Sequence, residues 1–480
     1  MSRTHLLLWQ EFWLKNALEL LKAYCVNCLI GKNREDTLET YFGVSSKNRK
    51  PLMSNRNFKK ERGWTMKRYL SKFEFTESFI EHSILECLSH RTGKVIRWNR
   101  KDTSYFLAEY FIKAGFAKER KTLYEISEFI YKDVDRNFSF YTSKLVPYIA
   151  QEMLKEIKER DITLKEIIYQ QRIDRSSGKI RDIGITSIKQ QVYDYICINA
   201  LKPLFDAKIG YYQCSSIKGR GQKHAKKAIE KCIRQKHKKA RYIIKSDIKK
   251  CYQSIRHDIL FKFLERDLKN DDALYLVEFL ISTYANDGIG LCIGTYLSQY
   301  LANYYLSYAY HYATEMAFVL RMERRSKRPK EVRPFTRVVF YMDDMVFIGA
   351  GKKYMKKAFK MVANYLKTVL GLELKNNNYQ LIDLFKKNAF VDVVGFRFYA
   401  DRTTIRKKIY KRICDDVKTI KKNGKYVDLK ICRGFMSRHG FVKNSNSAKF
   451  KRKSKYDYAF NIAKKVISDE AKSDLHRKAA

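Results

Sequence analysis

The chain has 480 residues, enough for roughly two to four domains. Its 98 lysine and arginine residues exceed its 51 aspartate and glutamate residues, and we expect the formal net charge of +47 to be spread over the whole chain. This excess predicts a polyanionic partner, and nucleic acid is the first candidate. No apolar run approaches the roughly 18 residues of a membrane helix, and no single amphipathic basic helix suggests a membrane surface.

Ten cysteines occur without the spacing of a disulfide framework, and the first residues do not form a signal peptide. We therefore expect reduced thiols in a soluble, cytoplasmic protein. Cys25 and Cys28 have the spacing of half a zinc site, but no second pair follows at ligand spacing. Two core cysteines on a helix are the favoured interpretation.

Residues 1–150 are predicted to be mainly helical. Apolar residues recur at helical spacing over 11–29 and 106–116, whereas the basic segment 47–63 contains Pro51 and is predicted to be a loop. This region indicates no function by itself.

After this region the pattern changes to strands. Residues 167–169 and 179–185 flank the turn residues 176–178, which predicts a hairpin. Lys179 and Arg181 on the second strand could clamp a triphosphate. A basic surface hairpin is the simpler interpretation of these two residues taken alone.

A helix is predicted over 189–205, followed by a glycine-containing basic loop over 215–221 and a basic helix over 223–241. Because the loop opens a helix, its backbone and Arg220 could contact a nucleic-acid phosphate. A solvated face is the default for such a basic helix, and the net charge of the chain favours a nucleic-acid face.

Two predicted strand elements carry acids at their ends. Residues 241–247 have the pattern of a buried strand that ends in Asp247, and residues 338–349 predict a strand, a tight turn with Asp343 and Asp344, and a second strand. Adjacent carboxylates repel each other unless a cation neutralises them. With Asp247 as a third carboxylate, the acids could bracket two divalent cations that assist an in-line phosphoryl displacement. Mg²⁺ suits such a site because it binds carboxylates together with substrate phosphates.

Between these acids, the glycine-containing residues 287–294 lead into a predicted helix whose first turn holds Ser298 and Gln299. On spacing alone this is a junction between a loop and a helix. Residues 321–337 are basic and contain two prolines, which predicts an exposed loop. The residues after Asp401 are basic and helical in pattern.

In their order and spacing these motifs resemble those of the reverse transcriptase family over residues 160–400. The strand that ends in Asp247 is similar to the first catalytic motif, and Tyr341-Met342-Asp343-Asp344 is similar to the YxDD box. Residues 290–303 fall on the motif between them, 370–381 on the next motif, and 391–397 on the primer-grip turn.

Two departures narrow the resemblance. Intron-encoded and retroviral enzymes usually carry Pro-Gln-Gly in the middle motif, where this sequence has residues 292–294, Cys-Ile-Gly. This version resembles the bacterial enzymes of diversity-generating retroelements, abortive infection and antiviral defence. The lysine that intron enzymes carry in the following motif falls on Asn378, and Lys375 is the nearest candidate for a general acid.

The resemblance implies an α+β fold, that of a right-hand polymerase. We expect a mainly helical region over 1–150, fingers over 151–240, a palm of antiparallel sheet and helices with the catalytic motifs over 241–400, and a basic helical thumb over 401–480.

The resemblance also implies roles for individual residues in nucleotidyl transfer. Two Mg²⁺ ions, or Mn²⁺ in their place, would be held by Asp247, Asp343, Asp344 and the Ile248 carbonyl. The nucleotide would be bound by Lys179, Arg181, Tyr252, Gly294, Ser298, Gln299 and Lys375. The nucleic acid would be bound by Arg220, Met342, Gly395, Phe396 and Arg433.

Tyr252 follows Asp247 by five residues, where the family carries an aromatic gate against a ribose 2′-hydroxyl. This position favours dNTPs as substrates. A core tyrosine at a junction between a strand and a helix is the alternative.

Three functions remain open. The first is an RNA-directed DNA polymerase that makes DNA from dNTPs on a dedicated non-coding RNA template in antiviral defence, as a monomer or an oligomer. The second is a template-independent or protein-primed DNA polymerase of the abortive-infection type. The third is a catalytically idle RNA-binding scaffold, which the intact set of three acids disfavours.

Overall fold

The structure is a computed structural model that describes residues 68–92, 95–117, 121–173, 178, 180–235, 237–284, 287–322 and 329–479. The predicted helix over 11–29, the predicted loop over 47–63, the Cys25–Cys28 pair and Lys179 lie outside the described residues.

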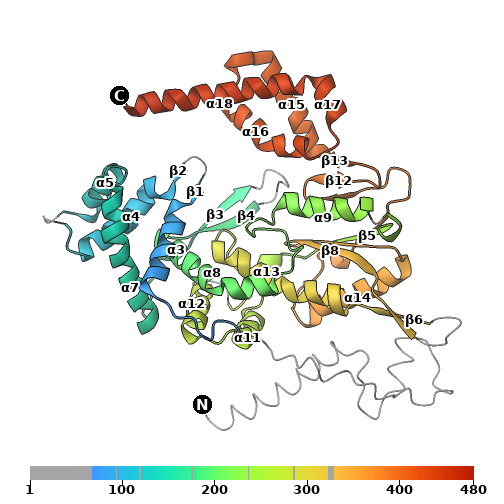
Figure 1. Cartoon of the computed structure of the whole chain (residues 1–480), viewed down its shortest axis with the longest axis horizontal. Coiled ribbons are helices and arrows are strands. Elements are labelled where there is room, and N and C mark those ends of the chain that lie inside the picture. Colours follow the sequence, from blue (N-terminus) through green and yellow to red (C-terminus); the bar gives the residue numbers. More distant parts are fainter. Residues whose placement is uncertain are drawn as a thin grey trace, which may run out of the picture.

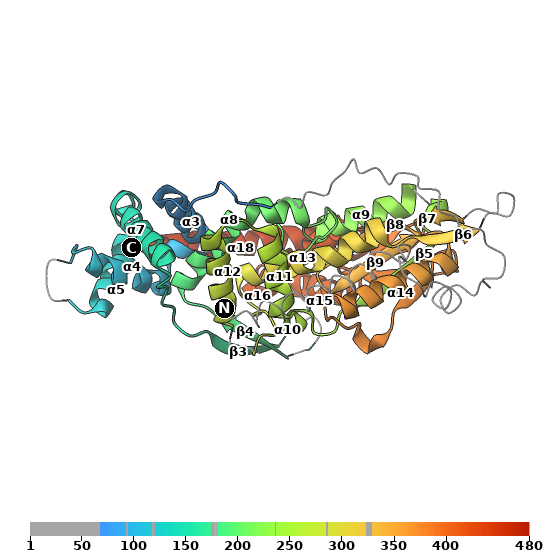
Figure 2. The same ribbon diagram turned by 90° about the horizontal axis from the view of Figure 1, so that it is seen from below.

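The described chain begins with a group of helices at one end of the molecule (Figures 1 and 2). They are α3 (Glu77–Ser89), α4 (Lys101–Lys113), α5 (Leu123–Asp133), α6 (Phe138–Phe140) and α7 (Val146–Glu159), with the short strands β1 (Arg91–Thr92) and β2 (Val95–Ile96). Local sequence fixes where α5 begins: the Thr122 hydroxyl accepts the Glu125 N–H, and the Glu125 carboxylate accepts the Thr122 N–H at 2.8 Å. The predicted helical character of this region is confirmed for its described part.

A four-stranded antiparallel sheet lies at the centre, in the order β10, β5, β9, β8. These strands are β5 (Tyr242–Asp247), β8 (Phe335–Tyr341), β9 (Asp344–Gly349) and β10 (Gln380–Asp383). In the register, Asp344 lies opposite both Tyr341 and Asp247. The predicted strand, turn and strand are therefore confirmed, with Met342 and Asp343 as the two turn residues.

Both faces of this sheet are covered, which explains its continuous apolar strands. Because side chains alternate along a strand, Phe347 of β9 packs towards α13 (Tyr296–His311) and α14 (Lys352–Thr368), and Val346 packs towards α9 (Gln222–Gln235). Ends of strands that are buried in this way keep fixed positions, so the acids that follow them are held by the fold.

The other elements of this central part are the hairpin β3 (Ile168–Ile173) and β4 (Ile180–Ile185), and the helices α8 (Ile188–Lys208), α10 (Cys251–Ser254), α11 (His257–Asp267) and α12 (Asp271–Ser282). The first hairpin and the helix over 189–205 are confirmed.

Two sequence predictions in this part need correction. The helix predicted over 223–241 is confirmed as α9 but ends at Gln235, and a short 3-10 helix over His237–Lys239 lies between it and β5. The predicted loop over 321–337 instead contributes to the hairpin of β6 (Val319–Met322) and β7 (Pro329–Val332) and to the start of β8. Pro329 is accommodated because it begins an exposed edge strand.

The C-terminal residues form a separate lobe (Figure 1). A three-stranded sheet of β11 (Val391–Val393), β12 (Phe396–Phe398) and β13 (Thr403–Ile405) precedes α15 (Lys407–Asn423), α16 (Leu429–Lys443), α17 (Ala448–Ser454) and α18 (Tyr456–Ala479). The four helices pack around an apolar core that includes Ile413, Phe435 and Tyr456. The predicted basic helical tail is confirmed, and we refer to α15–α18 as the C-terminal lobe.

Helices and antiparallel sheets are thus combined as an α+β fold. No helix among the described residues is both long enough and apolar enough to cross a membrane.

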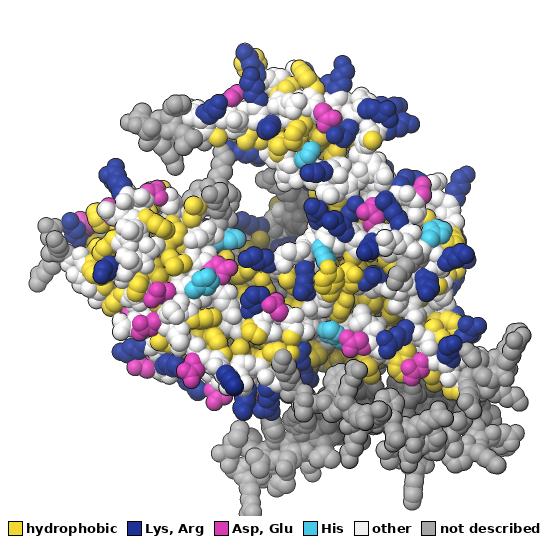
Figure 3. Space-filling view, in the orientation of Figure 1, with side chains coloured by type: hydrophobic (Ala, Val, Ile, Leu, Met, Phe, Trp, Pro, Cys, Tyr) yellow, Lys and Arg dark blue, Asp and Glu magenta, His cyan; other side chains and the backbone are white. Residues whose placement is uncertain are grey.

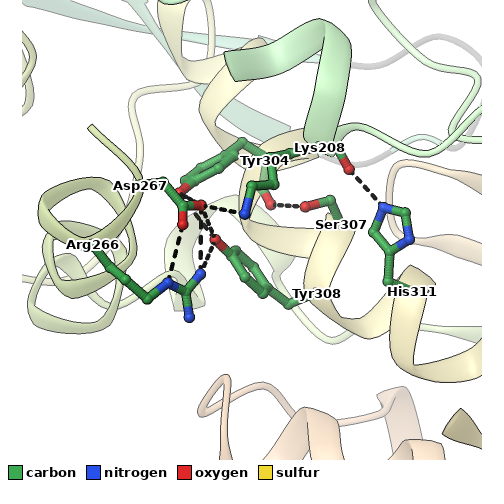
Figure 4. A network of polar contacts seen from close by, with 7 residues as sticks. All are labelled: Lys208, Arg266, Asp267, Tyr304, Ser307, Tyr308 and His311. Atoms are coloured by element: carbon green, nitrogen blue, oxygen red, sulfur yellow. Dashed lines mark hydrogen bonds and ion pairs between the residues drawn. The ribbon is translucent and has the colours of Figure 1, made fainter. Parts of the chain in front are cut away.

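A buried carboxylate ties three helices of the central part together (Figure 4). Asp267, at the end of α11, is 2% exposed and accepts hydrogen bonds from the hydroxyls of Tyr304 at 2.9 Å and Tyr308 at 2.7 Å. It also pairs with Lys208 at 3.0 Å and with Arg266 at 3.0 Å. Burial acts to raise the pKa of Asp267, but the hydrogen bonds from Arg266, Tyr308 and Lys208 hold it below its ordinary value.

Asp267→Asn should lower the free energy of unfolding by about 3–5 kcal/mol, because two cations then lose a buried partner. The wild-type stabilisation is present above the unfolded pKa of the group and is lost as pH falls through its lower folded pKa. Chemical denaturation at pH 7 measures the difference.

Asp258→Asn on the same helix is the matched control, since the pair of Asp258 with Arg256 is about half exposed. We expect this variant to lose less than about 1 kcal/mol. Equal effects of the two substitutions would contradict a structural role for the Asp267 network.

Candidate active site

The main chain brings three carboxylates to one end of the central sheet. Asp247 is the last residue of β5 and lies opposite Asp344, the first residue of β9. The Ile248 N–H donates to the Asp343 carbonyl at 3.1 Å, which closes the contact between β5 and the hairpin turn. The three acids that the sequence predicted to act together therefore lie at the same end of the sheet, and their metal-binding role stays a prediction.

The turn between β8 and β9 has an unusual backbone. Met342 has a φ of +55° although it is not glycine, and its side chain is only 7% exposed. A two-residue hairpin turn that matches the strand twist needs a positive φ at its first position, and an unbranched residue meets this requirement at a cost in strain. Met342 is held there by burial, so little of its side chain is free to contact nucleic acid.

The acids raise one another's pKa. Burial, followed by the charges of Asp247 and Asp344, raises the pKa of Asp343 to about 6. Burial also raises the pKa of Asp344, against the opposing effect of Lys245. Carboxylates that resist ionisation in this way gain from any cation placed between them.

Two lysines supply part of that positive charge. The ammonium of Lys375 lies 3.1 Å from Asp247, and the ammonium of Lys245 lies 3.7 Å from Asp344. Within the described part of the chain Asp343 forms no ion pair. Asp343 is therefore the carboxylate whose charge is least compensated.

A pocket of about 310 Å³ opens beside Asp247. It is lined by Lys245, Ser246, Asp247, Lys375, Asn376, Asn378, Tyr379 and Gln380. Lys375, predicted to bind the nucleotide, thus lies in the same pocket as the first acid.

The donor set fits Mg²⁺ or Mn²⁺. The carboxylates of Asp247 and Asp343 are within hydrogen-bonding reach of each other, and carboxylate oxygens are the ligands that these hard cations prefer. Among the described residues, no group of three or more Asp, Glu, His or Cys side chains is placed so that it could hold a metal ion. Mg²⁺ does not need such a group, because it commonly takes one or two carboxylates together with water and substrate phosphates.

The glycine loop before α13 lies against the β3–β4 hairpin. The Gly184 N–H donates to the Ile293 carbonyl at 2.8 Å. A Cβ atom at Gly294, whose φ is +125°, would lie 2.6 Å from the Gly184 carbonyl oxygen. Only glycine permits this approach. The contact places β4, which carries the exposed residue Arg181, beside the loop that contains Gly294.

Tyr252 lies between the acids and this loop. Its carbonyl accepts the Leu291 N–H at 2.8 Å, and its side chain is partly buried. Burial is the main cause that raises the pKa of Tyr252, and the charge of Asp343 contributes.

Two residues at the start of α13 were predicted to bind the nucleotide, and they differ in exposure. Ser298 is fully buried and pairs with the Thr295 hydroxyl at 2.5 Å, so it is not open to a nucleotide, whereas Gln299 is partly exposed.

Asp194 on α8 is buried and accepts the N–H groups of Tyr296 at 3.2 Å and Leu297. Burial raises the pKa of Asp194 to about 7. An acid within the apolar stretch of α8 was the only hint in the sequence.

The residues predicted to bind nucleic acid differ in exposure. Arg220 is partly buried and donates to the carbonyls of Ile209 and Gly210. Phe396 is 3% exposed within the sheet core, and Arg433 on α16 is exposed. Gly395 has a φ of +78° in the β11–β12 turn and lies against the C-terminal lobe.

A model of the family described as reverse transcriptase (RNA-dependent DNA polymerase) matches residues 172–398. These residues form a reverse transcriptase domain. The match spans β4, the central sheet, all three acids and the β11–β12 turn, whereas Arg433 on α16 lies beyond it. The domain is that of an RNA-directed DNA polymerase and has the fold of a right-hand polymerase.

Solved structures with detectable similarity include telomerases of two yeasts. The apo telomerase from Candida tropicalis is 11% identical, with a TM-score of 0.35, over 83% of this chain and 85% of that chain. The telomerase from Candida albicans in complex with a fragment of telomeric RNA is 12% identical, with a TM-score of 0.37, over 82% of this chain and 77% of that chain. No curated protein sequence matches the chain.

Asp343→Asn should raise the melting temperature by a few degrees at pH 8 without divalent cations. The folded pKa of Asp343 is about 6, above its unfolded value of about 4, so its stabilising contribution is lost as pH rises between these values. Asparagine does not ionise in this pH range. The variant therefore avoids both the loss of stability that ionisation of Asp343 causes and the repulsion from the other two acids. Differential scanning calorimetry in EDTA across pH 4–8 gives the difference between the two proteins.

Addition of Mg²⁺ should make the wild type melt at a higher temperature than Asp343→Asn, because only the wild type keeps the charge that binds the ion. Asp401→Asn, at an exposed site, controls for the loss of one negative charge. If Asp343→Asn instead melts below the wild type in EDTA, and Mg²⁺ stabilises both proteins equally, then the acids do not repel one another in the folded protein as described here.

Proposed function

We propose that this protein copies a dedicated non-coding RNA into DNA from dNTPs in the bacterial cytoplasm, as part of antiviral defence. The grouping of Asp247, Asp343 and Asp344 inside a reverse transcriptase domain carries the enzymatic part of the proposal. The defence role rests on the resemblance of residues 292–294, Cys-Ile-Gly, to the enzymes of bacterial defence systems.

The distribution of charge supports a nucleic-acid substrate. Residues 171–480 contain 67 lysine and arginine residues against 29 aspartate and glutamate residues, whereas residues 68–170 contain 18 against 16. The prediction that the excess is spread over the whole chain is therefore wrong for the N-terminal helices. Lysine and arginine side chains border the hollow between the C-terminal lobe and the rest of the molecule (Figure 3). A template and its product would lie there, because a polyanion gains most from this surface.

In this proposal Asp247 and Asp343 would hold two Mg²⁺ ions, with the Ile248 carbonyl and Asp344 assisting, and the ions would supply charge neutralisation at the attacking and leaving oxygens. The 3′-hydroxyl of the primer attacks the α-phosphate of the nucleotide and gives its proton to water. The bond from the α-phosphorus to the oxygen that bridges to the β-phosphate breaks, and pyrophosphate leaves. Lys179, Arg181 and Lys375 bind the triphosphate. Catalysis then consists of orientation and of fixed positive charge where negative charge develops.

Recovery of the protein from its host, followed by sequencing of bound RNA and of DNA made from added dNTPs, tests the proposal. We expect one enriched RNA and DNA complementary to it, with no incorporation by Asp247→Asn or Asp343→Asn. DNA unrelated to any bound RNA would favour template-independent synthesis. DNA joined to a tyrosine would favour protein priming, and bound RNA with no DNA synthesis would favour a scaffold.

Tyr252→Ala should admit rNTPs with only a modest loss of dNTP use, because removal of the ring removes the clash with a 2′-hydroxyl. Tyr252→Phe keeps the ring and should keep the discrimination. The measurement is the ratio of dNTP to rNTP incorporation for the three proteins, with their melting temperatures alongside.

A core role for Tyr252 predicts a different result. Tyr252→Ala would then lower stability on the scale of 3–5 kcal/mol and leave the ratio unchanged. An unchanged ratio would mean that Tyr252 does not select the sugar of the nucleotide. The main reason in the sequence to expect a DNA product would then be lost.

A further inference from the structure

Lys245 lies among the acids of the site, although no sequence motif gives it a role. It precedes Asp247 by two residues on β5, so both side chains point to the same face of the sheet. Its ammonium lies 3.7 Å from Asp344 and donates to the main-chain carbonyl of Asp392 at 2.8 Å. Lys245 therefore joins the β8–β9 hairpin to β11.

Asp392 extends this chain of contacts to the C-terminal lobe. Its carboxylate accepts a hydrogen bond from Arg406 at 2.5 Å and lies 3.4 Å from the Arg397 guanidinium. Arg406 directly precedes α15, and its N–H donates to the Gly395 carbonyl in the β11–β12 turn at 3.0 Å. Polar contacts thus run without a break from Asp344 to the first helix of the C-terminal lobe.

The two acids of the hairpin differ in their partners. Asp344 is held by Lys245, whereas Asp343 forms no ion pair within the described residues. Of the two acids of the hairpin, Asp344 is therefore the one that an ion pair ties to β5.

We infer that Lys245 is a positioning residue that fixes the catalytic hairpin through Asp344 and links it, through Asp392 and Arg406, to the C-terminal lobe. The inference rests on the proposed polymerase function and deepens it. Its consequence is that a lobe seated on nucleic acid holds the hairpin in place, because the same contacts connect them.

Lys245→Met separates this role from that of an ordinary ion pair. Removal of a positive charge beside the acids should lower the Mn²⁺ concentration for half-maximal thermal stabilisation by about three- to tenfold. Loss of the anchor should lower the rate of single-nucleotide incorporation by about ten- to a hundredfold. Metal affinity and rate thus change in opposite senses, which a general loss of stability does not produce.

Lys245→Arg keeps the charge and should restore most of both properties. Lys249→Met is the matched control, since Lys249 lies just beyond β5 but pairs with the exposed Glu373 at 3.2 Å. We expect its Mn²⁺ dependence and incorporation rate to match the wild type.

The double variant with Lys245→Met and Arg406→Gln tests the link to the C-terminal lobe. Its incorporation rate should fall by less than the product of the two single effects, because one chain of contacts is cut twice. Independent effects, or an unchanged Mn²⁺ midpoint in Lys245→Met, would overturn the inference. Absence of incorporation by the wild type would instead reject the proposed function, and the Mn²⁺ measurement would still test the role of Lys245.

Discussion

Repulsion between three carboxylates is the constraint on which the rest of this structure depends. Asp247, Asp343 and Asp344 meet at one end of the central sheet, where burial and then the charges of the other two acids raise the pKa of Asp343. The sheet holds the acids there because apolar packing on both faces fixes β5, β8 and β9. Energy gained in that packing offsets the electrostatic cost, and a divalent cation between the acids would remove much of it.

The surroundings of the acids follow from this arrangement. The glycine loop before α13 approaches the β3–β4 hairpin so closely that only Gly294 fits, and Tyr252 lies between that loop and Asp343. On the other side, Lys245 and the β11–β12 turn connect the hairpin to the C-terminal lobe. The glycine loop and the C-terminal lobe are thus both connected to the residues around one short turn, and burial holds the strained backbone of Met342 within that turn.

Local patterns made the central features predictable. β-branched and aromatic residues on both sides of Asp343 and Asp344 specify a hairpin, and the apolar run before Asp247 specifies a buried strand. Features that depend on distant contacts were not predictable. Ser298 has the spacing of an exposed first turn but packs inward against Thr295, and Asp194 caps α13 from a helix about one hundred residues earlier. Lys245 appears in the sequence as one more lysine, and only the pairing of β5 with β9 places it beside Asp344.

Anomalous diffraction from a crystal of the protein with Mn²⁺ and a non-hydrolysable dNTP tests the central claim most directly. The account predicts two manganese peaks about 3.5–4 Å apart, bound by the carboxylates of Asp247 and Asp343. Full occupancy of the nucleotide site with no manganese between these two carboxylates would contradict it.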